Sequence, residues 1–432
     1  MIKDNKTLAA ETCVLAIGRA EKALADACLK FEQQHKVTLK KVMLVNESFT
    51  KSDEYFGDES QGAFEIIVVN FDDESSLLNC TKYLNKFNLI AHCRYEPCIQ
   101  DYARVIPYLD TKYVQSPASL KLSTIKSEMR KAFLSSYPEI SPRYIKINKK
   151  EDVNPPTLSS FTFPVIVKPI GLNSSWLVTK CDTYDKLKKT IDESFDKVDK
   201  IYNKFYGVGE KAFVIEEFIT GKMYTIDSYV NNEGELSHLP PTRVITSNEM
   251  GKDGFYCYRS MTQTFLTNQE VRTGNICVEK AVSAVGLRNS TVHAELYLTK
   301  NGWKVIEIGP RIGGGKQFLY KEAYGIDHFY NDLLIHAGLE PDTTILHTRY
   351  ASGFCMYAEK EGLITSITGI EDVRNLSSLK RLHIAVKPGE QAVFASNGGR
   401  YVLDGNLSND QSEQLDDDFE TIVKTIKINV AP

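Results

Sequence analysis

The sequence lacks the features of membrane, nucleic-acid-binding and disulfide-rich proteins. No uninterrupted apolar run reaches the roughly 18 residues that a membrane span needs. The net charge of −4 gives no basic excess for nonspecific nucleic-acid binding. The nine cysteines are odd in number and form no Cys-x-x-Cys pair, which argues against a zinc site or a disulfide framework and favours reduced thiols. We therefore expect a cytoplasmic protein without a nucleic-acid or membrane partner.

Three common nucleotide-binding motifs are also absent. No Gly-x-Gly-x-x-Gly follows the first predicted strand at 40–46, so that strand is not predicted to bind a dinucleotide. The segment PRIGGGKQ departs from a P-loop, because Pro310 stands at the first glycine position and Gln317 at the position of the Mg²⁺-binding Ser or Thr. The segment VIVKP (165–169) is similar to the kinase strand with its lysine, but no His-Arg-Asp or Asp-Phe-Gly appears.

What is present is an ordinary globular composition, 42% hydrophobic and 25% charged, in a chain of 432 residues that is long enough for two or three domains. Short apolar runs at 40–46, 64–71 and 88–96 alternate with helical patterns, which predicts a parallel α/β domain over 1–119. The segment AAETCVLAIGRAEKALADACLK (9–30) contains too many charges for a signal peptide and is interpreted as an amphipathic helix.

Two further lobes are predicted. The central lobe, 120–220, begins with a helix at about 120–136 and contains a polar linker at 148–160. The larger lobe, 221–432, carries paired β runs, and its last part, from about residue 350, is rich in short strands.

The most informative segment is the predicted hairpin at 290–315, STVHAELYLTKNGWKVIEIGPRIGGG, because each arm carries one glutamate. A three-residue loop at 300–302 that ends in glycine is a common connection, since glycine adopts the left-handed conformation that the loop needs. A two-residue Asn-Gly loop is the alternative, but it would mix acids and aliphatic side chains on each face. The three-residue loop predicts these facing pairs: Thr299–Trp303, Tyr297–Val305, Glu295–Glu307 and His293–Gly309.

In this register the two glutamates share one face of the ribbon. Their Cβ atoms would lie roughly 5 Å apart, and the carboxylates would repel each other. Either one carboxyl group is protonated, or a divalent cation lies between them, and Mg²⁺ suits carboxylates combined with substrate phosphates. Arg311 continues the alternation on this face, where its guanidinium suits phosphate or carboxylate. The opposite face carries the side chains expected in a core: Ala294, Leu296, Ile306 and Ile308.

The order of these features resembles the ATP-grasp superfamily, most closely the carboxylate-amine ligases of the L-amino-acid (dipeptide) ligase type. Lys126 lies on a predicted helix, Lys168 on a strand before the loop GLNSS, then IEEFITG (215–221) precedes the hairpin with EIGPRIGGG. YEPCIQDYA (95–103) also looks like a family segment. The resemblance implies an α/β ATP-grasp fold: a Rossmann-like N-terminal domain, a small α+β lid lobe, and a larger α+β C-terminal lobe with an antiparallel sheet.

The resemblance also implies how ATP would be held. The two lysines would contact the phosphates, and the loop at 171–175 would close over them with its backbone N–H groups. Glu216 would meet the adenine amine, and the backbone of the residues after it would read the adenine edge. The implied ATP-contacting set is Lys126, Lys168, Ser174, Ser175, Glu216, Glu217 and Ile219.

For catalysis, the resemblance implies that Glu295 and Glu307 ligate Mg²⁺, with Mn²⁺ as an alternative, and that Arg311 stabilises the γ-phosphate and an acyl-phosphate. His293 would either touch the substrate or be a structural histidine. Arg243 and Arg259 would either clamp a substrate carboxylate or lie at the surface. The implied substrate-contacting set is His293, Arg311, Gly313, Gly314, Arg243 and Arg259.

Two positions depart from the family's pattern. Members often have an acid that holds the ribose hydroxyls seven residues after the adenine-contacting glutamate, where this chain has Met223. Many also have an asparagine two residues after the second metal glutamate, where this chain has Gly309. We therefore expect a different ribose contact and one fewer protein ligand to the metal, a place that water can take.

The function implied by the resemblance is ATP-dependent ligation of a carboxylic acid or amino acid to the amino group of an amino acid. The reaction would pass through an acyl-phosphate and release ADP and phosphate, with small molecules as partners and a homodimer as the family-level expectation. Two alternatives stay open. One is an ATP-grasp ligase for another acceptor, of the D-alanine, carrier-protein or peptide-tailoring type. The other is a nucleotide-binding regulatory protein that has lost catalysis.

Overall fold

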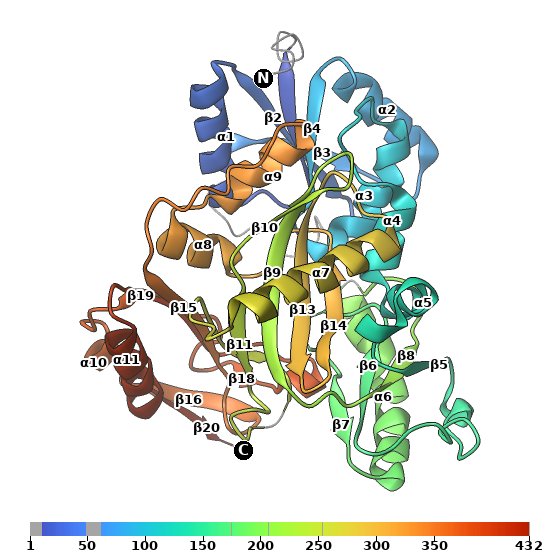
Figure 1. Ribbon diagram of the computed structural model, residues 1–432, viewed down its shortest axis with the longest axis vertical. Coiled ribbons are helices and arrows are strands. Elements are labelled where there is room, and N and C mark those ends of the chain that lie inside the picture. Colours follow the sequence, from blue (N-terminus) through green and yellow to red (C-terminus); the bar gives the residue numbers. More distant parts are fainter. Residues whose placement is uncertain (1–10, 49–61, 174, 206, 253, 432) are drawn as a thin grey trace.

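The computed structural model describes residues 11–48, 62–173, 175–205, 207–252 and 254–431, and arranges them in three lobes (Figure 1). The N-terminal lobe contains a parallel sheet, whereas the two other lobes are built on antiparallel sheets. Among the described residues, no helix combines the length and apolar character needed to cross a bilayer.

The N-terminal lobe is a four-stranded parallel sheet in the order β3-β2-β1-β4. Helix α9 (His328–His336), from much later in the chain, packs against α1 and β4 and ties this lobe to the C-terminal one (Figure 1). The elements of the lobe are β1 (Thr12–Ile17), α1 (Lys22–His35), β2 (Leu39–Asn46), β3 (Glu65–Val69), α2 (Glu74–Leu84), β4 (Asn88–His92) and α3 (Ile99–Val105).

Strand β1 shows that the predicted helix at 9–30 was wrong over Thr12–Ile17, and residues 9 and 10 lie outside the described residues. The side chains of Cys13 to Ile17 are fully buried between strands β2 and β4, and the helix begins only at Lys22, after a turn at Gly18 (φ 83°). A short, continuous apolar run fits a doubly covered parallel strand as well as a buried helix, so periodicity could not separate the two.

The central lobe predicted at 120–220, called the lid lobe from here on, contains a four-stranded antiparallel sheet in the order β5-β8-β6-β7. Helix α6 packs on the apolar face of this sheet. The predicted helix at 120–136 is two helices, which are separated by the extended backbone of Ile125. The predicted linker at 148–160 is partly packed, since Val153 and Leu158 are buried in the lid core. The elements are α4 (Pro117–Thr124), α5 (Lys126–Ser136), β5 (Tyr144–Ile147), β6 (Val165–Pro169), β7 (Thr179–Cys181), α6 (Tyr184–Phe205) and β8 (Phe213–Glu217).

The C-terminal lobe is built on a nine-stranded sheet, in the order β14-β13-β9-β11-β12-β15-β19-β17, with β10 paired to β9. Its elements up to α8 are β9 (Lys222–Val230), β10 (Leu236–His238), β11 (Thr242–Thr246), β12 (Cys257–Met261), α7 (Asn268–Val285), β13 (Ser290–Thr299), β14 (Gly302–Gly309) and α8 (Lys316–Tyr324).

The part after residue 350 is only partly a separate subdomain. Strands β15, β17 and β19 continue the large sheet, and β18, β16 and β20 form a three-stranded sheet of their own. The elements are β15 (Tyr350–Met356), β16 (Gly362–Thr368), α10 (Ile370–Val373), β17 (Leu379–Ile384), β18 (Gln391–Ala392), β19 (Leu403–Asn409), α11 (Ser412–Thr425) and β20 (Lys427–Ala431).

Helix α7 covers the apolar face of the hairpin formed by β13 and β14 (Figure 1). Its start is encoded by a capping box: the side chain of Thr267 accepts from the backbone N–H of Glu270, and the Glu270 carboxylate accepts from the N–H of Thr267. Val278 and Val282 of the helix are buried in the same cluster as Ala294 of the hairpin. The other face of the hairpin is thereby directed away from the helix.

The base of the hairpin pairs as predicted, but its tip does not. At the tip only Lys300 and Asn301 lie outside the ladder, because Thr299 already pairs with Gly302, whose φ of 99° lies in the left-handed region. A bulge nearer the base then restores the predicted register. The observed pairs are Thr299–Gly302, Leu298–Trp303, Tyr297–Lys304, Leu296–Val305, Glu295–Glu307, Ala294–Ile308 and His293–Gly309.

The residue accommodated by the bulge is Ile306. The prediction that Ile306 enters the core was wrong: Val305 is fully buried there instead, and Ile306 lines a cavity on the other side. The bulge leaves the Ile306 carbonyl outside the ladder, and the Nη2 of Arg130 donates to it at 2.5 Å. Alternation of residue types could not show the bulge, because a two-residue turn plus one bulged residue has the same length as a three-residue loop.

Candidate active site

The three lobes together line one cavity of about 870 Å³, a volume typical of sites for small molecules. Its wall contains many charged side chains from all three lobes. The basic ones are Arg19, Arg94, Lys126, Lys168, Lys204, Arg311, Lys316 and Arg400, and the acidic ones are Glu96, Glu216, Glu217, Glu295, Glu307 and Asp404.

Glu295 and Glu307 face each other across the hairpin and line this cavity, as predicted. Lys126, the first residue of α5, lies with its Nζ 3.3 Å from Oε2 of Glu307. Burial and the carboxylates of Glu96 and Glu295 raise the pKa of Glu307, although Lys126 opposes them. Burial also acts on Glu295, but the neighbouring His293 lowers its pKa. The environment therefore favours one ionised carboxylate and makes the second one costly to ionise without a further cation.

The carboxylates of Glu295 and Glu307 suit a Mg²⁺ ion whose other ligands come from a phosphate. Within the described residues, no group of three or more His, Cys, Asp or Glu side chains is arranged to hold a metal ion. Two facing carboxylates, Glu295 and Glu307, are nevertheless what Mg²⁺ uses when substrate phosphates supply the other ligands.

Arg311 reaches the same cavity, where it forms an ion pair with Glu96 of the N-terminal lobe. Its Nε lies 3.2 Å from Oε2 of Glu96, and its Nη2 contacts the same oxygen. Despite burial, this charge lowers the pKa of Glu96. Sequence reasoning did not single out Glu96, although it lies in the YEPCIQDYA segment that carried part of the resemblance.

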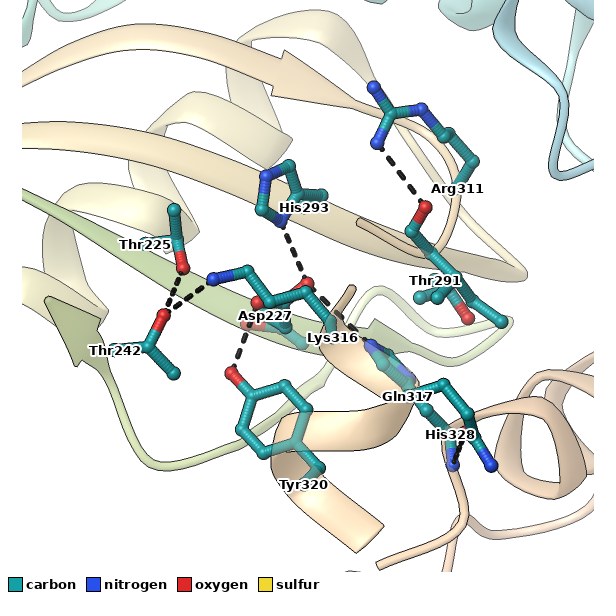
Figure 2. Close-up of polar contacts among 12 residues, drawn as sticks. Thr225, Asp227, Thr242, Thr291, His293, Arg311, Lys316, Gln317, Tyr320 and His328 are labelled. Carbon is teal, nitrogen blue, oxygen red and sulfur yellow. Dashed lines mark hydrogen bonds and ion pairs between the residues drawn. The ribbon is translucent and has the colours of Figure 1, made fainter. Parts of the chain in front are cut away.

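His293 is held in place by a buried aspartate. Its Nδ1 lies 2.9 Å from Oδ1 of Asp227, and Oδ2 of the same carboxylate accepts from the hydroxyl of Tyr320 at 3.0 Å. Figure 2 shows His293, Tyr320 and His328 pointing toward Asp227 from three different elements. Burial opposes protonation of His293, but Asp227 raises its pKa. A Cβ at Gly313 would lie 2.4 Å from the His293 ring, so this position requires glycine.

Lys316 is a cavity residue that sequence reasoning missed. It begins α8 directly after the glycine run and is 3% exposed. Its Nζ donates to the hydroxyl of Thr242 at 2.6 Å (Figure 2), and to the hydroxyl of Ser260 at 3.1 Å. Burial lowers its pKa. The available signal was a lysine that directly follows three glycines at a helix start. Of those glycines, Gly314 lines the cavity, whereas Gly313 packs behind it against His293.

On the lid side, Glu216 is shared by two buried cations. Lys168 Nζ lies 2.8 Å from one carboxylate oxygen, and Arg130 Nε lies 2.8 Å from the other. Although burial raises it, these charges lower the pKa of Glu216 to about 2. The next residue, Glu217, pairs with Arg143, and its backbone N–H donates to the Arg143 carbonyl. Ile219 lines the cavity beside them.

The loop at 171–175 reaches from the lid to the C-terminal lobe. The hydroxyl of Ser175 donates to the carbonyl of Phe255 at 3.1 Å, and Trp176 Nε1 donates to the carbonyl of Gly399 at 3.0 Å. Ser174 lies outside the described residues. Ser175 and Trp176 thus connect the two lobes at the rim of the cavity.

Arg243 and Arg259 are not positioned as predicted. Neither lines the cavity or lies at the surface, since both are buried and already paired. Arg243 contacts Glu249 and donates to the Met223 carbonyl at 2.8 Å, and Arg259 pairs with Asp416 at 2.7 Å. The reason is strand alternation: the neighbouring residues of β11 and β12, not the arginines, face the cavity.

Both positions that depart from the family's pattern, Met223 and Gly309, line the cavity. A Cβ at Gly309 would lie 3.4 Å from Cζ of Arg311. The guanidinium of Arg311 thus occupies space that a longer side chain at 309 would need.

Comparisons with known proteins agree with this architecture. Residues 161–318 match the family model of the ATP-grasp domain. The chain is 29% identical over 212 residues to the phosphoribosylamine–glycine ligase of Methanosphaera stadtmanae, covering 45% of this chain and 46% of that protein. It is 23% identical over 180 residues to dapdiamide A synthase of Enterobacter agglomerans, covering 41% and 40%. The aligned part thus spans less than half the length of either curated relative.

Among solved structures, the L-amino acid ligase from Bacillus licheniformis has a similar fold, with a TM-score of 0.73 at 18% identity over 98% of this chain and 99% of that one. The phosphoribosylglycinamide synthetase from Anaerococcus prevotii gives 0.64 at 15% identity, over 98% and 99%. The fold class and the resemblance predicted from the sequence are confirmed: the chain has the ATP-grasp fold and carries an ATP-grasp domain at residues 161–318.

Proposed function

We propose that the protein is an ATP-dependent ligase that joins a carboxylic acid or amino acid to the amino group of an amino acid and releases ADP and phosphate. The observation that carries this proposal is the facing pair Glu295 and Glu307 in a cavity that Lys126, Lys168 and Arg311 also line. Two carboxylates among several cations suit a triphosphate bound together with a divalent metal.

In this proposal Glu295 and Glu307 hold Mg²⁺, which neutralises phosphate charge when bound. Lys126 and Lys168 are paired with Glu307 and Glu216 and lie where phosphate oxygens can add to those contacts. Phosphoryl transfer needs little side-chain chemistry beyond positioning and charge neutralisation. The basic side chains of the cavity can supply both.

The chemistry has two steps. An oxygen of the substrate carboxylate attacks the γ-phosphorus of ATP, the bond from that phosphorus to the bridging oxygen breaks, and ADP leaves. The amine nitrogen then attacks the acyl carbon, the carbon–oxygen bond to phosphate breaks, and the nitrogen loses a proton. Arg311 is the cation we assign to the transferred phosphoryl group, with Glu96 fixing its orientation.

The name of one similar structure, L-amino acid ligase, supports an amino acid as one substrate. A second candidate is a ligase for a different amine. The likeness to a phosphoribosylamine–glycine ligase, at 29% identity over 212 residues, favours it.

The test is ADP release by the purified chain with ATP and Mg²⁺, screened across pairs of acids and amines, with mass spectrometry of the product. We expect release that needs both substrates and a product equal in mass to their sum minus water. Glu295→Gln and Glu307→Gln should each abolish release without altering the fold, whereas Glu279→Gln, on α7, should not. Turnover retained in both hairpin variants would contradict the metal assignment. ATP binding without ADP release for any pair would favour the non-catalytic alternative.

A further inference from the structure

We propose that Arg19 and Arg94 form an anion subsite, and that the substrate bound there carries a carboxylate or phosphate in addition to the groups that react. This inference rests on the proposed function, because it concerns a substrate of the same cavity. Both arginines line that cavity from the N-terminal lobe.

The position of the two arginines follows from the topology of the parallel sheet. Strand β1 lies between β2 and β4 in the order β3-β2-β1-β4. The chain adds β2 and β3 on one side of β1 and then returns to add β4 on its other side, so the strand order reverses between β1 and β4. Arg19 follows the end of β1 at Ile17 by two residues, and Arg94 follows the end of β4 at His92 by two. Open parallel sheets bind ligands at such a switch point, outside the carboxyl ends of the strands.

Both side chains retain unused hydrogen-bonding capacity. The Nε atoms of Arg19 and Arg94 are buried and have no hydrogen-bond partner within the described ranges. Arg94 uses Nη1 for Glu21, and its guanidinium lies 5.6 Å from the centre of the Phe329 ring. Buried polar groups are normally paired, and a guanidinium fork matches the two oxygens of a carboxylate or phosphate. A carboxylate or phosphate of a ligand, with the two guanidinium groups oriented toward it, would supply acceptors for these Nε–H groups.

The local charges leave room for one anion. Besides burial, the charges of Arg311 and Arg19 lower the pKa of Arg94, so the three guanidinium groups lie within electrostatic reach of one another. The carboxylates paired with them are Glu21, on Arg94, and Glu96, on Arg311. In the described part of the chain, Arg19 has no ion pair. Asp332 is a further acid near Arg94, but its carboxylate already contacts His92 and Thr291.

The anion that fits this subsite belongs to the substrate rather than to ATP. The cations that we assign to ATP are Lys126 and Lys168, which lie on α5 and on the lid strand β6. Arg19 and Arg94 approach the cavity from the opposite, N-terminal lobe, on the side of the Arg311–Glu96 pair. A substrate could thus place one group at Arg311 for reaction and a second, charged group at the two arginines.

The experiment compares matched substrates in the ADP-release assay. Each substrate that supports turnover and carries a second, non-reacting carboxylate is tested with that carboxylate free and as its carboxamide, and phosphorylated amines are tested beside their unphosphorylated forms. Arg19→Met and Arg94→Met should lower kcat/KM for the anionic form by roughly 10- to 100-fold, the loss expected for one charge-assisted hydrogen bond. The neutral form and the KM for ATP should be unaffected. Which anion shows the loss identifies carboxylate or phosphate as the group recognised.

The control variant is Arg104→Met, since Arg104 lies on α3 of the same lobe, is half exposed, and does not line the cavity. Equal kcat/KM for wild type and both variants, or equal losses for charged and neutral forms, would overturn the subsite. No ADP release by the wild type with any pair would instead refute the proposed function. In that case thermal melting with inorganic phosphate or succinate still tests the subsite, because smaller shifts in Arg19→Met and Arg94→Met than in Arg104→Met support it and equal shifts refute it.

Discussion

Replacing Glu216 with glutamine should weaken the junction between the lid and the rest of the molecule. Glu216 is 1% exposed, and its two carboxylate oxygens each lie 2.8 Å from a buried cation, on Arg130 and Lys168. Against the effect of burial, these cations lower the pKa of Glu216 from 4.5 to about 2. At about 1.36 kcal/mol per pH unit, the difference corresponds to roughly 3 kcal/mol of folding free energy. The expected loss for Glu216→Gln is of that order, in line with the cost of breaking a buried pair.

The loss should also depend on pH in a defined direction. Because folding lowers the pKa of Glu216, the ionised carboxylate stabilises the fold fully above pH 4.5, and this contribution disappears as the pH falls toward 2. The difference in unfolding free energy between wild type and Glu216→Gln should therefore be constant from about pH 7 to pH 5 and shrink at lower pH.

Urea unfolding followed by circular dichroism and tryptophan fluorescence measures this difference. Glu217→Gln is the matched control, because Glu217 is the next residue of β8 and pairs with Arg143, whose side chain is 55% exposed. Exposed pairs contribute only about 0–1 kcal/mol. Equal destabilisation by the two variants, or a Glu216→Gln effect that stays constant down to pH 3, would refute the reasoning.

Three further changes give distinct outcomes. Arg311→Ala should lower kcat more than it raises KM for ATP in initial-rate measurements, because we assign it to charge that develops during transfer, and the reverse pattern would make it a binding residue only. Met223→Glu should leave ATP affinity, measured by calorimetry, unchanged or tighter, since it restores the acid that family members use for ribose; a large loss would contradict this. Gly313→Ala should cost about 1–3 kcal/mol in urea unfolding, because its Cβ would lie 2.4 Å from His293, whereas Gly314→Ala, with no atom within 4 Å, should be neutral. Similar effects of the two alanines would exclude the close contact as the cause.

The parts of the site that depend on local order along the chain could be predicted from the sequence. The facing of Glu295 and Glu307 required only the alternation of a strand and the place of a glycine in the turn. The pairing at the base of the hairpin is the predicted one, but for a different reason. The turn is one residue shorter than predicted, and the bulge at Ile306 adds that residue back. The alternation of residue types predicts which side chains share a face of the ribbon, but it does not predict where a bulge places an extra residue.

The parts that depend on contacts between distant segments could not be predicted. Glu96 and Arg311 are separated by 215 residues and meet only because the N-terminal lobe packs against the C-terminal one. Lys316 becomes a cavity residue because two hydroxyl groups from other strands hold its ammonium. The sequence leaves Arg243 open between a substrate contact and a surface position, and in the structure one step of strand alternation turns it away from the cavity into a buried place. Such placements follow from tertiary packing, which a single sequence does not encode in any local pattern.

Arg130 limits how the lobes can move relative to one another. Its fully buried guanidinium contacts the carboxylate of Glu216 in the lid sheet and the carbonyl of Ile306 in the nine-stranded sheet. Separating the two sheets at this point would leave the buried guanidinium of Arg130 without its partners, which costs several kcal/mol. Rotation about an axis through Arg130 would displace these two contacts least, because they lie at the axis. We therefore expect the lid to open for nucleotide exchange as a hinge with its axis near Arg130. The contacts of Ser175 and Trp176 at the cavity rim, not this junction, should be the ones that separate.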